Sequence, residues 1–422
     1  MTDLPLAATQ PLDSAPPETH SEMRYVARQP ILNLTGKVQG YELLFRQKPS
    51  SGFGEESKQA TRAIFDDTLS IGLEPLTGNL PAFIHCTEES ILEHLVEVLP
   101  PSRTVLEIDA SLDFSRDLPA ACRHLKSRGY HLALDNFIWD SLLEPMVHIA
   151  DYIKIDFQQC NPAVRRDLMG LFRHAPAQLV ATGIETPDAQ SQARKEGFTL
   201  FQGFYFCFPE PLRHARIPSN RQSHFQLLQL LYRDPLDLKK VVPLVKRDAN
   251  LSYRLLCLAN SPALAVHQEI SSLEGAILFI GESAFRRIAS VAILTEINSG
   301  RPPEILRMTL LRARFCELAA PLRSLDPEEQ YLLGMLSLLP AMLRIPMETL
   351  ASQLPLRHEI HQALLGQETP ERWLLQWIEF WEKGRWEECD AMAQKTELPQ
   401  QQLVQCYQMA LSWDGNPQSI TD

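Results

Sequence analysis

The stretch YHLALDNFIWDSLLEPMVHIADYIKIDF, residues 130–157, decides the fold class of this chain. It holds two apolar runs, YHLALDNF and DYIKIDF, separated by a spacer of helix length. Similar runs occur on both sides of it, from YVARQPIL near residue 25 to FQGFYF near residue 201. Strand-like runs that alternate with helix-length spacers are typical of βα units. We therefore expect a parallel sheet or a closed α/β barrel over the first half of the chain.

The second half has a different pattern. From about residue 222 onward the β-branched runs disappear, and stretches such as LLQLLYRD and YLLGMLSLLPAML show helix-type spacing. This predicts an all-α domain over residues 223–415, a linker over residues 213–222, and a short tail over residues 416–422. The first 22 residues contain four prolines and no Lys or Arg, and we expect them to be disordered. The barrel domain is then expected over residues 23–212.

Composition limits the possible partners and compartment. The chain has 422 residues and a formal net charge of −12, which disfavours binding to nucleic acid or to an anionic membrane. Its 8 cysteines include no C-x-x-C pair, as expected for reduced thiols in a cytosolic protein. No apolar run is long enough to span a bilayer, and the start of the chain lacks the basic and apolar regions of a secretory signal. We expect a cytoplasmic protein.

Polar residues interrupt the predicted strands at regular places. In a strand alternate side chains share a face, so Lys154 and Asp156 face one way while Ile153 and Ile155 face the other. Charged groups in apolar strands are costly to bury unless they are paired or bind a metal. The interrupting residues, about 19 to 43 positions apart, are Glu42, His85, Glu107, Asp135, Lys154, Thr182 and Gln202.

This spacing favours successive βα units that each place one polar residue at the carboxyl end of a strand, which is the active-site face of a (β/α)8 barrel. Several carboxylates that converge with one lysine suit binding of a divalent metal and hydrolysis of a phosphate ester. A set of separate structural ion pairs is the alternative that the spacing leaves open.

The order of these motifs resembles that of the EAL family of cyclic-di-GMP phosphodiesterases. RQPI at residues 28–31 and GYELLFR at residues 40–46 resemble the family's opening, with Glu-Leu-Leu where the family has Glu-Ala-Leu. Further matches are LEI at 106–108, LDNF at 134–137, IKID at 153–156, GIET at 183–186 and QGF at 202–204. The resemblance covers about residues 24–212 and implies a TIM-like (β/α)8 EAL barrel.

The resemblance also implies roles for individual residues. The metal ligands, for Mg²⁺ or Mn²⁺, would be Glu42, Glu107, Asp135 and Asp156. Lys154 would help to orient the attacking water, and Glu185 would support the site. The residues that contact the dinucleotide would be Gln29, Arg46 and Gln202.

The chain departs from the family's pattern at several of these places. His85 replaces the metal-binding Asn, Asn136 replaces the second Asp of Asp-Asp-Phe-Gly, and Thr182 replaces the first Glu of Ala-Glu-Gly-Val-Glu. Because Mg²⁺ prefers oxygen ligands, these changes predict weak or absent metal binding and a catalytically degenerate barrel. Trp139 stands in the following loop, where it could also fill the pocket.

Three functions stay open for such a barrel. It could bind cyclic-di-GMP without turnover, or it could act as an adaptor that needs no ligand. It could also remain an active phosphodiesterase, since most of the acidic residues are retained and His85 could support Mn²⁺ where Mg²⁺ fails.

Residues from about 223 to 415 resemble the HDOD module. The matching stretches include RDANLSYRLL at 247–256, ISSL at 270–273 and GMLSLL at 334–339. HDOD modules are similar to HD hydrolases that lack the metal-binding His-Asp pair, and none of the 12 histidines here is followed by Asp. The resemblance implies a protein partner for this domain. Trp373, Trp377 and Trp381 share one helical stripe, which predicts either core packing or a groove for that partner.

Overall fold

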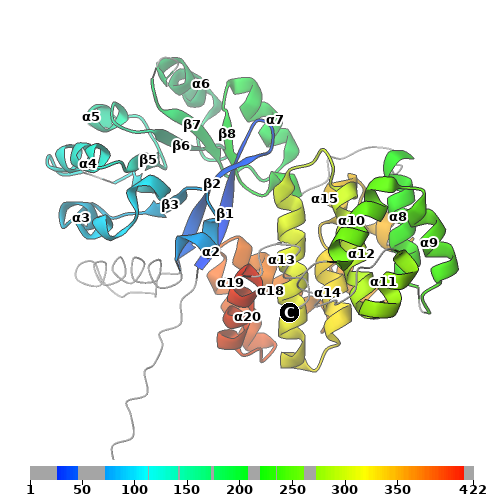
Figure 1. Ribbon diagram of the computed structural model, residues 1–422. Helices are drawn as coiled ribbons and strands as arrows, with labels where there is room; N and C mark the ends of the chain where they lie inside the picture. Colours follow the sequence, from blue (N-terminus) through cyan, green and yellow to red (C-terminus); the bar gives the residue numbers. More distant parts are fainter. Residues whose placement is uncertain are drawn as a thin grey trace, which may run out of the picture.

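The computed structural model describes residues 26–45, 72–112, 114–140, 143–172, 175–207, 219–233, 235–260 and 272–412. A closed eight-stranded barrel is followed by a helical domain, and the two lie side by side (Figure 1). The predicted fold class, a TIM-like barrel followed by an all-α domain, is confirmed. The two predicted tails, residues 1–22 and 416–422, lie outside the described residues, and so does Arg46.

The barrel differs from an all-parallel one at its first strand. Strand β1 runs antiparallel to both β2 and β8, while the other neighbouring strands are parallel. The cause is the short turn at residues 34–37, which leaves no room for a crossover helix. In this turn the Asn33 side-chain oxygen accepts the N–H groups of Thr35 and Lys37, and Gly36 has a φ of 77°. The strands are β1 (Val26–Asn33), β2 (Val38–Phe45), β3 (Ala82–His85), β4 (Thr104–Asp109), β5 (His131–Asp135), β6 (Tyr152–Asp156), β7 (Gln178–Thr182) and β8 (Leu200–Gln202).

Short helices cover the outside of the barrel. Alternate strand residues such as Ile153 and Ile155 are buried beneath them in the large core. Two of the helices begin at a capping side chain followed by proline, at Asn161 and Thr186. The helices are α2 (Leu73–Thr77), α3 (Glu88–Leu92), α4 (Leu118–Ser127), α5 (Glu144–Val147), α6 (Pro162–Leu171) and α7 (Pro187–Glu196), and the 3-10 helix η5 (Tyr205–Cys207) follows β8.

The helical domain is built around one long helix, α13, which packs against α14, α18 and α20. Helix α8 begins at Ser219, so the last four residues of the predicted linker are already helical. The helices are α8 (Ser219–Leu231), α9 (Leu238–Lys246), α10 (Ala249–Ala259), α11 (Leu273–Ile280), α12 (Glu282–Ile297), α13 (Pro303–Ala319), α14 (Pro327–Leu336), α15 (Leu339–Leu343), α16 (Met347–Ala351), α17 (His358–Leu364), α18 (Arg372–Glu382), α19 (Trp386–Lys395) and α20 (Gln400–Ser412). Within the described ranges, no helix is both long and apolar enough to cross a membrane.

The tryptophan stripe on α18 belongs mainly to the core. Trp377 and Trp381 are fully buried, and their rings stack with centroids 4.7 Å apart. Phe315 of α13 stacks on the other side of Trp377 at 5.2 Å. Trp373 is only partly buried and lies under the guanidinium of Arg323. Core packing is therefore the correct interpretation for two of the three tryptophans.

The two domains meet on the outer face of β1 and β2. The Tyr41 hydroxyl of β2 donates a hydrogen bond of 2.8 Å to Glu304 Oε2 of α13, and the Arg307 guanidinium lies 5.0 Å from the centre of the Tyr41 ring. Glu42, the neighbour of Tyr41, faces into the barrel, so β2 carries the interior site on one side and the domain contact on the other.

Candidate active site

The barrel interior is arranged in two layers, with one residue from nearly every strand in each. The lower layer is apolar and consists of Ile31, Phe83, Val105, Ala133, Tyr152, Val180 and Leu200. Two positions further along each strand, toward the carboxyl ends of β2 to β8, the same face carries polar residues. These residues are Gln29, Glu42, His85, Glu107, Asp135, Lys154, Thr182 and Gln202. Every residue in the sequence-predicted series therefore belongs to one layer.

Lys154 lies at the centre of the polar layer. Its side chain is only 1% exposed, and its Nζ donates hydrogen bonds of 2.5 Å to Glu42 Oε2 and 2.6 Å to Glu107 Oε1. Asp135 Oδ1 lies 3.6 Å from the same nitrogen. Strands β2, β4, β5 and β6 thus bring three carboxylates around one ammonium group.

The pKa values in this cluster are shifted in opposite directions. Burial and the nearby Glu42 carboxylate raise the pKa of Glu107 well above its ordinary value. Burial would also raise the pKa of Glu42, but the charge and hydrogen bond of Lys154 outweigh it and lower that pKa. Burial would lower the pKa of Lys154, but the charges of Glu107, Glu42 and Asp135 outweigh it and raise that pKa. Lys154 therefore stays protonated, and Glu107 gains a proton more readily than Glu42.

Two buried oxygens in the polar layer have no hydrogen-bond partner among the described residues. They are Glu107 Oε2 and Gln202 Oε1. The amide nitrogen of Gln202 is used, because Nε2 donates bonds of 2.9 Å to Gln29 Oε1 and 2.5 Å to Glu42 Oε2. Unpartnered buried oxygens are costly in a folded protein, so they point to a ligand or water that would donate to them. Two of the three residues expected to contact a dinucleotide thus lie together, while Arg46 lies outside the described residues.

The fourth expected metal ligand, Asp156, is not part of the Lys154 cluster. Its Oδ1 accepts the backbone N–H groups of Gln158 and Gln159 at 2.8 and 2.9 Å, which holds the loop after β6. Within the part of the chain that the structure describes, no group of three or more His, Cys, Asp or Glu side chains is placed to hold a metal ion. The Lys154 ammonium lies between Glu42 and Glu107, two of the carboxyl groups expected to hold a metal ion.

The residues that depart from the family's pattern lie around the cluster. Asn136, directly after β5, has a φ of 48°, and its amide lies 3.5 Å from Asp109 Oδ2. His85 is exposed at the end of β3, near Glu42 of the neighbouring strand. Thr182 is half-buried at the end of β7. Glu185 is half-buried beyond it, and no hydrogen bond or ion pair joins it to another described residue.

The expectation that Trp139 fills the pocket is wrong. Its ring is 42% exposed and meets Phe137 and Phe172 edge-on, with centroids 6.4 Å apart in both cases. Phe172 directly follows α6, so the tryptophan packs on the outer layer of the barrel. The apolar surface beside α6 offered a better contact than the polar interior.

Two glycines allow the chain to close this end of the barrel. Gly203 has a φ of 142°, and a Cβ added there would lie 2.1 Å from the carbonyl oxygen of Ile184. Gly183 has a φ of 68° and lies against the Asp156 carboxylate. The glycines of the GIET and QGF motifs are therefore explained by backbone conformations and close contacts that a side chain would not permit.

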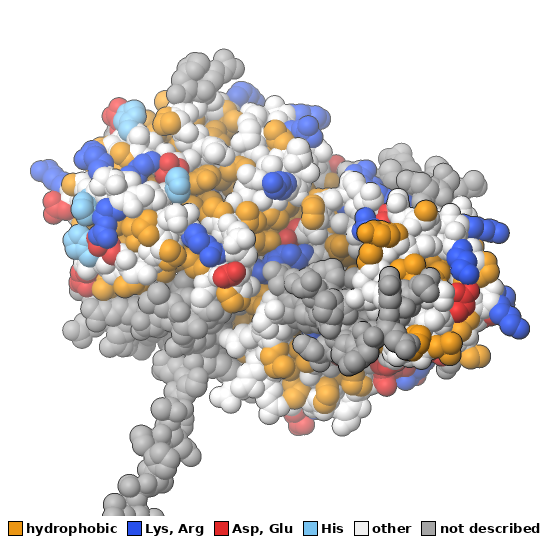
Figure 2. Space-filling view, in the orientation of Figure 1, with side chains coloured by type: hydrophobic (Ala, Val, Ile, Leu, Met, Phe, Trp, Pro, Cys, Tyr) orange, Lys and Arg blue, Asp and Glu red, His pale blue; other side chains and the backbone are white. Residues whose placement is uncertain are grey.

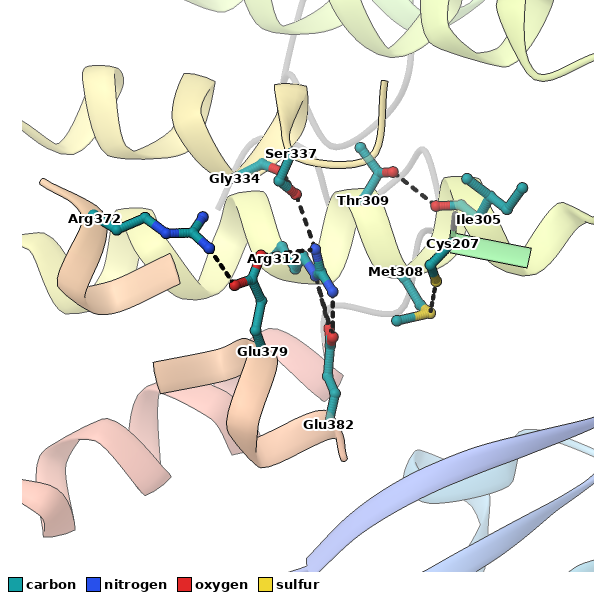
Figure 3. Close-up of polar contacts among 10 residues, drawn as sticks. All are labelled: Cys207, Ile305, Met308, Thr309, Arg312, Gly334, Ser337, Arg372, Glu379 and Glu382. Atoms are coloured by element: carbon teal, nitrogen blue, oxygen red, sulfur yellow. Dashed lines mark hydrogen bonds and ion pairs between the residues drawn. The ribbon is translucent and has the colours of Figure 1, made fainter. Parts of the chain in front are cut away.

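A second buried charge cluster lies in the helical domain and was not predicted from the sequence. Arg312 of α13 donates to Glu382 of α18 through Nη2 at 2.6 Å and through Nε at 3.1 Å (Figure 3). Its Nη1 reaches the Ser337 hydroxyl at 3.3 Å, and Arg372 pairs with Glu379 at 2.5 Å. The residues come from distant parts of the chain, and no local sequence pattern links them.

Comparison with known proteins supports both domains. Residues 17–209 match the EAL domain, and residues 217–351 match the HDOD domain. The chain is 31% identical over 403 residues to the uncharacterized protein YuxH of Bacillus subtilis, covering 93% of this chain and 98% of that protein. It is 34% identical over 374 residues to the cyclic di-GMP phosphodiesterase CdgJ of Vibrio cholerae, covering 86% of each.

Among solved structures, part of the chain is similar to Klebsiella pneumoniae BlrP1 in a complex with calcium and cyclic-di-GMP. The identity is 20% and the TM-score 0.36, over 47% of this chain and 58% of that one. The matches to YuxH and CdgJ extend over most of this chain, and so across both of its domains. This chain belongs to the family of proteins in which an EAL domain is followed by an HDOD domain.

Proposed function

We propose that this protein is a signal-transduction regulator whose EAL barrel binds cyclic-di-GMP without hydrolysing it, and whose HDOD domain binds a protein partner. The main support is the position of Lys154, whose ammonium lies between the carboxylates of Glu42 and Glu107. Next to this cluster, Asn136 and Thr182 are neutral where the EAL pattern has carboxylates. A metal-dependent hydrolase needs that negative charge to hold its ions and activate water.

Binding without turnover uses groups that remain in the polar layer. Glu107 Oε2 and Gln202 Oε1 are buried acceptors that lack a partner among the described residues. Guanine carries ring and exocyclic N–H donors, which could satisfy such acceptors. Glu42 and Asp135, at 15% and 16% exposure, lie where the layer opens toward solvent. The polar layer therefore combines open access with unused hydrogen-bonding capacity.

The domain contact offers a route from ligand to partner. Gln29 and Glu42 lie on the inner face of β1 and β2, while Tyr41 contacts Glu304 of α13 on the outer face. A ligand that favours one position of these strands would favour one arrangement of the helical domain. The HDOD partner would then sense the nucleotide through the difference in its affinity for the two arrangements.

Isothermal titration with cyclic-di-GMP, in Mg²⁺ and then in Mn²⁺, tests the proposal. We expect binding heat, and the recovered nucleotide should be intact when it is separated by chromatography. Gln202→Ala should weaken binding, while Gln39→Ala, a change at an exposed glutamine of β2, should not. Absence of heat in both metals would contradict nucleotide binding and leave an adaptor that needs no ligand.

An active cyclic-di-GMP phosphodiesterase is the second candidate. The similarity to CdgJ, which is named as such an enzyme, favours it, as does the retention of Glu42, Glu107 and Asp135. This candidate requires linear dinucleotide to appear in the titrated sample and to disappear with Glu42→Ala. That result would replace the proposal of binding without turnover.

A further inference from the structure

A groove of about 820 Å³ lies in the helical domain, between the α8–α9 loop and the α16–α17 loop. It is lined by Leu236, Leu238 and Leu356, and each of these leucines is only half-buried. Pro235 and Pro355 are exposed on the two loops. Apolar side chains that line a groove and stay partly in water are typical of a site that binds another chain segment.

Hydrogen bonds hold both walls of the groove. Arg286 of α12 donates to the carbonyl oxygen of Leu231 and, at 3.1 Å, to that of Arg233, which holds the start of the α8–α9 loop. Gln229 of α8 donates to the Gln353 carbonyl at 2.9 Å and so ties α8 to the chain after α16. The groove is therefore part of the fold and needs no ligand to form.

The positive charge at the groove is only partly neutralised. Lys240 pairs with Asp237 at 2.7 Å, and Arg357 pairs with a glutamate of α14 at 2.9 Å. Arg233 and Lys239 are exposed, and neither side chain forms a hydrogen bond or ion pair with another described residue. Figure 2 shows Lys and Arg side chains along the edge of the helical domain where Figure 1 places α9. The two free cations favour an acidic occupant.

The first 22 residues of this chain have the composition that such a groove requires. They contain four acidic residues and no Lys or Arg, and DLPL at 3–6 and PLD at 11–13 place leucines beside carboxylates. They precede the described residues, which begin at Val26 on β1. A chain of about 25 residues can extend about 85 Å, whereas a compact protein of about 400 residues has a radius of gyration of about 21 Å. The segment is therefore long enough to reach the groove from β1.

We propose that the groove binds the acidic N-terminal segment, residues 1–22, of its own chain. The leucines of the segment leave water against the leucines of the groove, and its carboxylates pair with Arg233 and Lys239. Exposed ion pairs are weak, but the covalent link gives the segment an effective concentration of about millimolar, so a weak intrinsic affinity is enough. The bound segment excludes other acidic peptides from this face of the helical domain. The proposal does not depend on whether the barrel binds or hydrolyses cyclic-di-GMP.

Photo-crosslinking of the full-length protein tests the position of the segment. With p-benzoylphenylalanine incorporated at Leu12, crosslinks should form to residues 232–240 or 355–357 of the same chain, as located by mass spectrometry. Their yield should not depend on the protein concentration, because the contact is intramolecular. A synthetic peptide of residues 1–22 in millimolar excess should lower the yield by competition.

Two charge-reversed variants of the same full-length protein test the role of the free cations. Arg233→Glu/Lys239→Glu should lower the crosslinking yield at least about threefold, because two attractions become repulsions. Lys246→Glu/Arg247→Glu, which changes the net charge equally at exposed positions outside the groove, is the matched control and should leave the yield unchanged. Crosslinks at other sites, crosslinks between two chains, or equal yields for the two double variants would each overturn the proposal.

Discussion

The two buried charge clusters of this protein differ in how completely their groups are satisfied. In the helical domain, two arginines face two glutamates, and Arg312 and Glu382 are 6% and 5% exposed. In the barrel, one ammonium faces three carboxyl groups, and Glu107 Oε2 lacks a partner among the described residues. A cluster with balanced charges stabilises a fold, whereas an unbalanced cluster with an unpartnered oxygen is prepared for a ligand.

Removing the cation of the balanced cluster should have the largest effect on stability. Arg312→Met leaves the buried Glu382 carboxylate without its counterion, so the free energy of unfolding should fall by about 3–5 kcal/mol. Urea unfolding of the full-length protein measures the change. The double variant Arg312→Met/Glu382→Met should recover most of the loss, because no charge is left buried. A double variant as unstable as the single one would contradict this account of the cluster.

Weakening the contact between the two domains should lower the free energy of unfolding by an intermediate amount. Tyr41→Phe removes the hydrogen bond to Glu304, a side chain that is only 4% exposed. The expected loss is about 1.5 kcal/mol, since the acceptor is a buried carboxylate. Tyr253→Phe, at a hydroxyl on a residue that is 70% exposed, is the control and should change the stability little. Equal losses in the two variants would show that the Tyr41–Glu304 bond does not hold the domains together.

The barrel cluster should tolerate a neutral substitution with the smallest effect on stability, and that effect should depend on pH. Because folding raises the pKa of Glu107, the native protein binds this proton more tightly than the unfolded chain, in which the glutamate titrates near its ordinary pKa of 4.5. As the pH rises from the ordinary pKa of about 4.5 to the raised pKa of the folded state, the wild-type protein therefore loses the stability that this group contributes. Glu107→Gln does not titrate there, so its stability relative to wild type should increase with pH.

Urea unfolding of Glu107→Gln and wild type at several pH values tests this sign. Glu144→Gln, a change at an exposed glutamate of α5, is the matched control for the loss of one carboxylate. If the stability of Glu107→Gln relative to wild type decreased as the pH rose, the raised pKa and the unbalanced character of the barrel cluster would both be wrong.

Local patterns explain what could be predicted from the sequence. The alternation in YIKID and TVLEID placed Lys154 and Glu107 on one face, and the barrel brings those faces together. The antiparallel pairing of β1 and β2 could also have been predicted locally, because Asn33 and Gly36 are typical turn residues. The order of the motifs alone predicted a parallel arrangement of these strands.

Long-range pairs explain what could not be predicted. Tyr41 and Glu304 are 263 positions apart, and Arg312 and Glu382 are 70 apart, so no periodicity relates them. The side to which Trp139 packs depended on the apolar surface near Phe172, which only the folded barrel provides.

The formation of linear dinucleotide from cyclic-di-GMP tests the central claim most directly. It should be followed in Mn²⁺ and in Mg²⁺ for the wild-type protein and for the variant His85→Asn/Asn136→Asp/Thr182→Glu, which restores the oxygen ligands of the EAL pattern. We predict no turnover by the wild-type protein and measurable turnover by the restored variant. Turnover by the wild-type protein at a rate equal to that of the variant, and abolished by Glu42→Ala, would contradict the account.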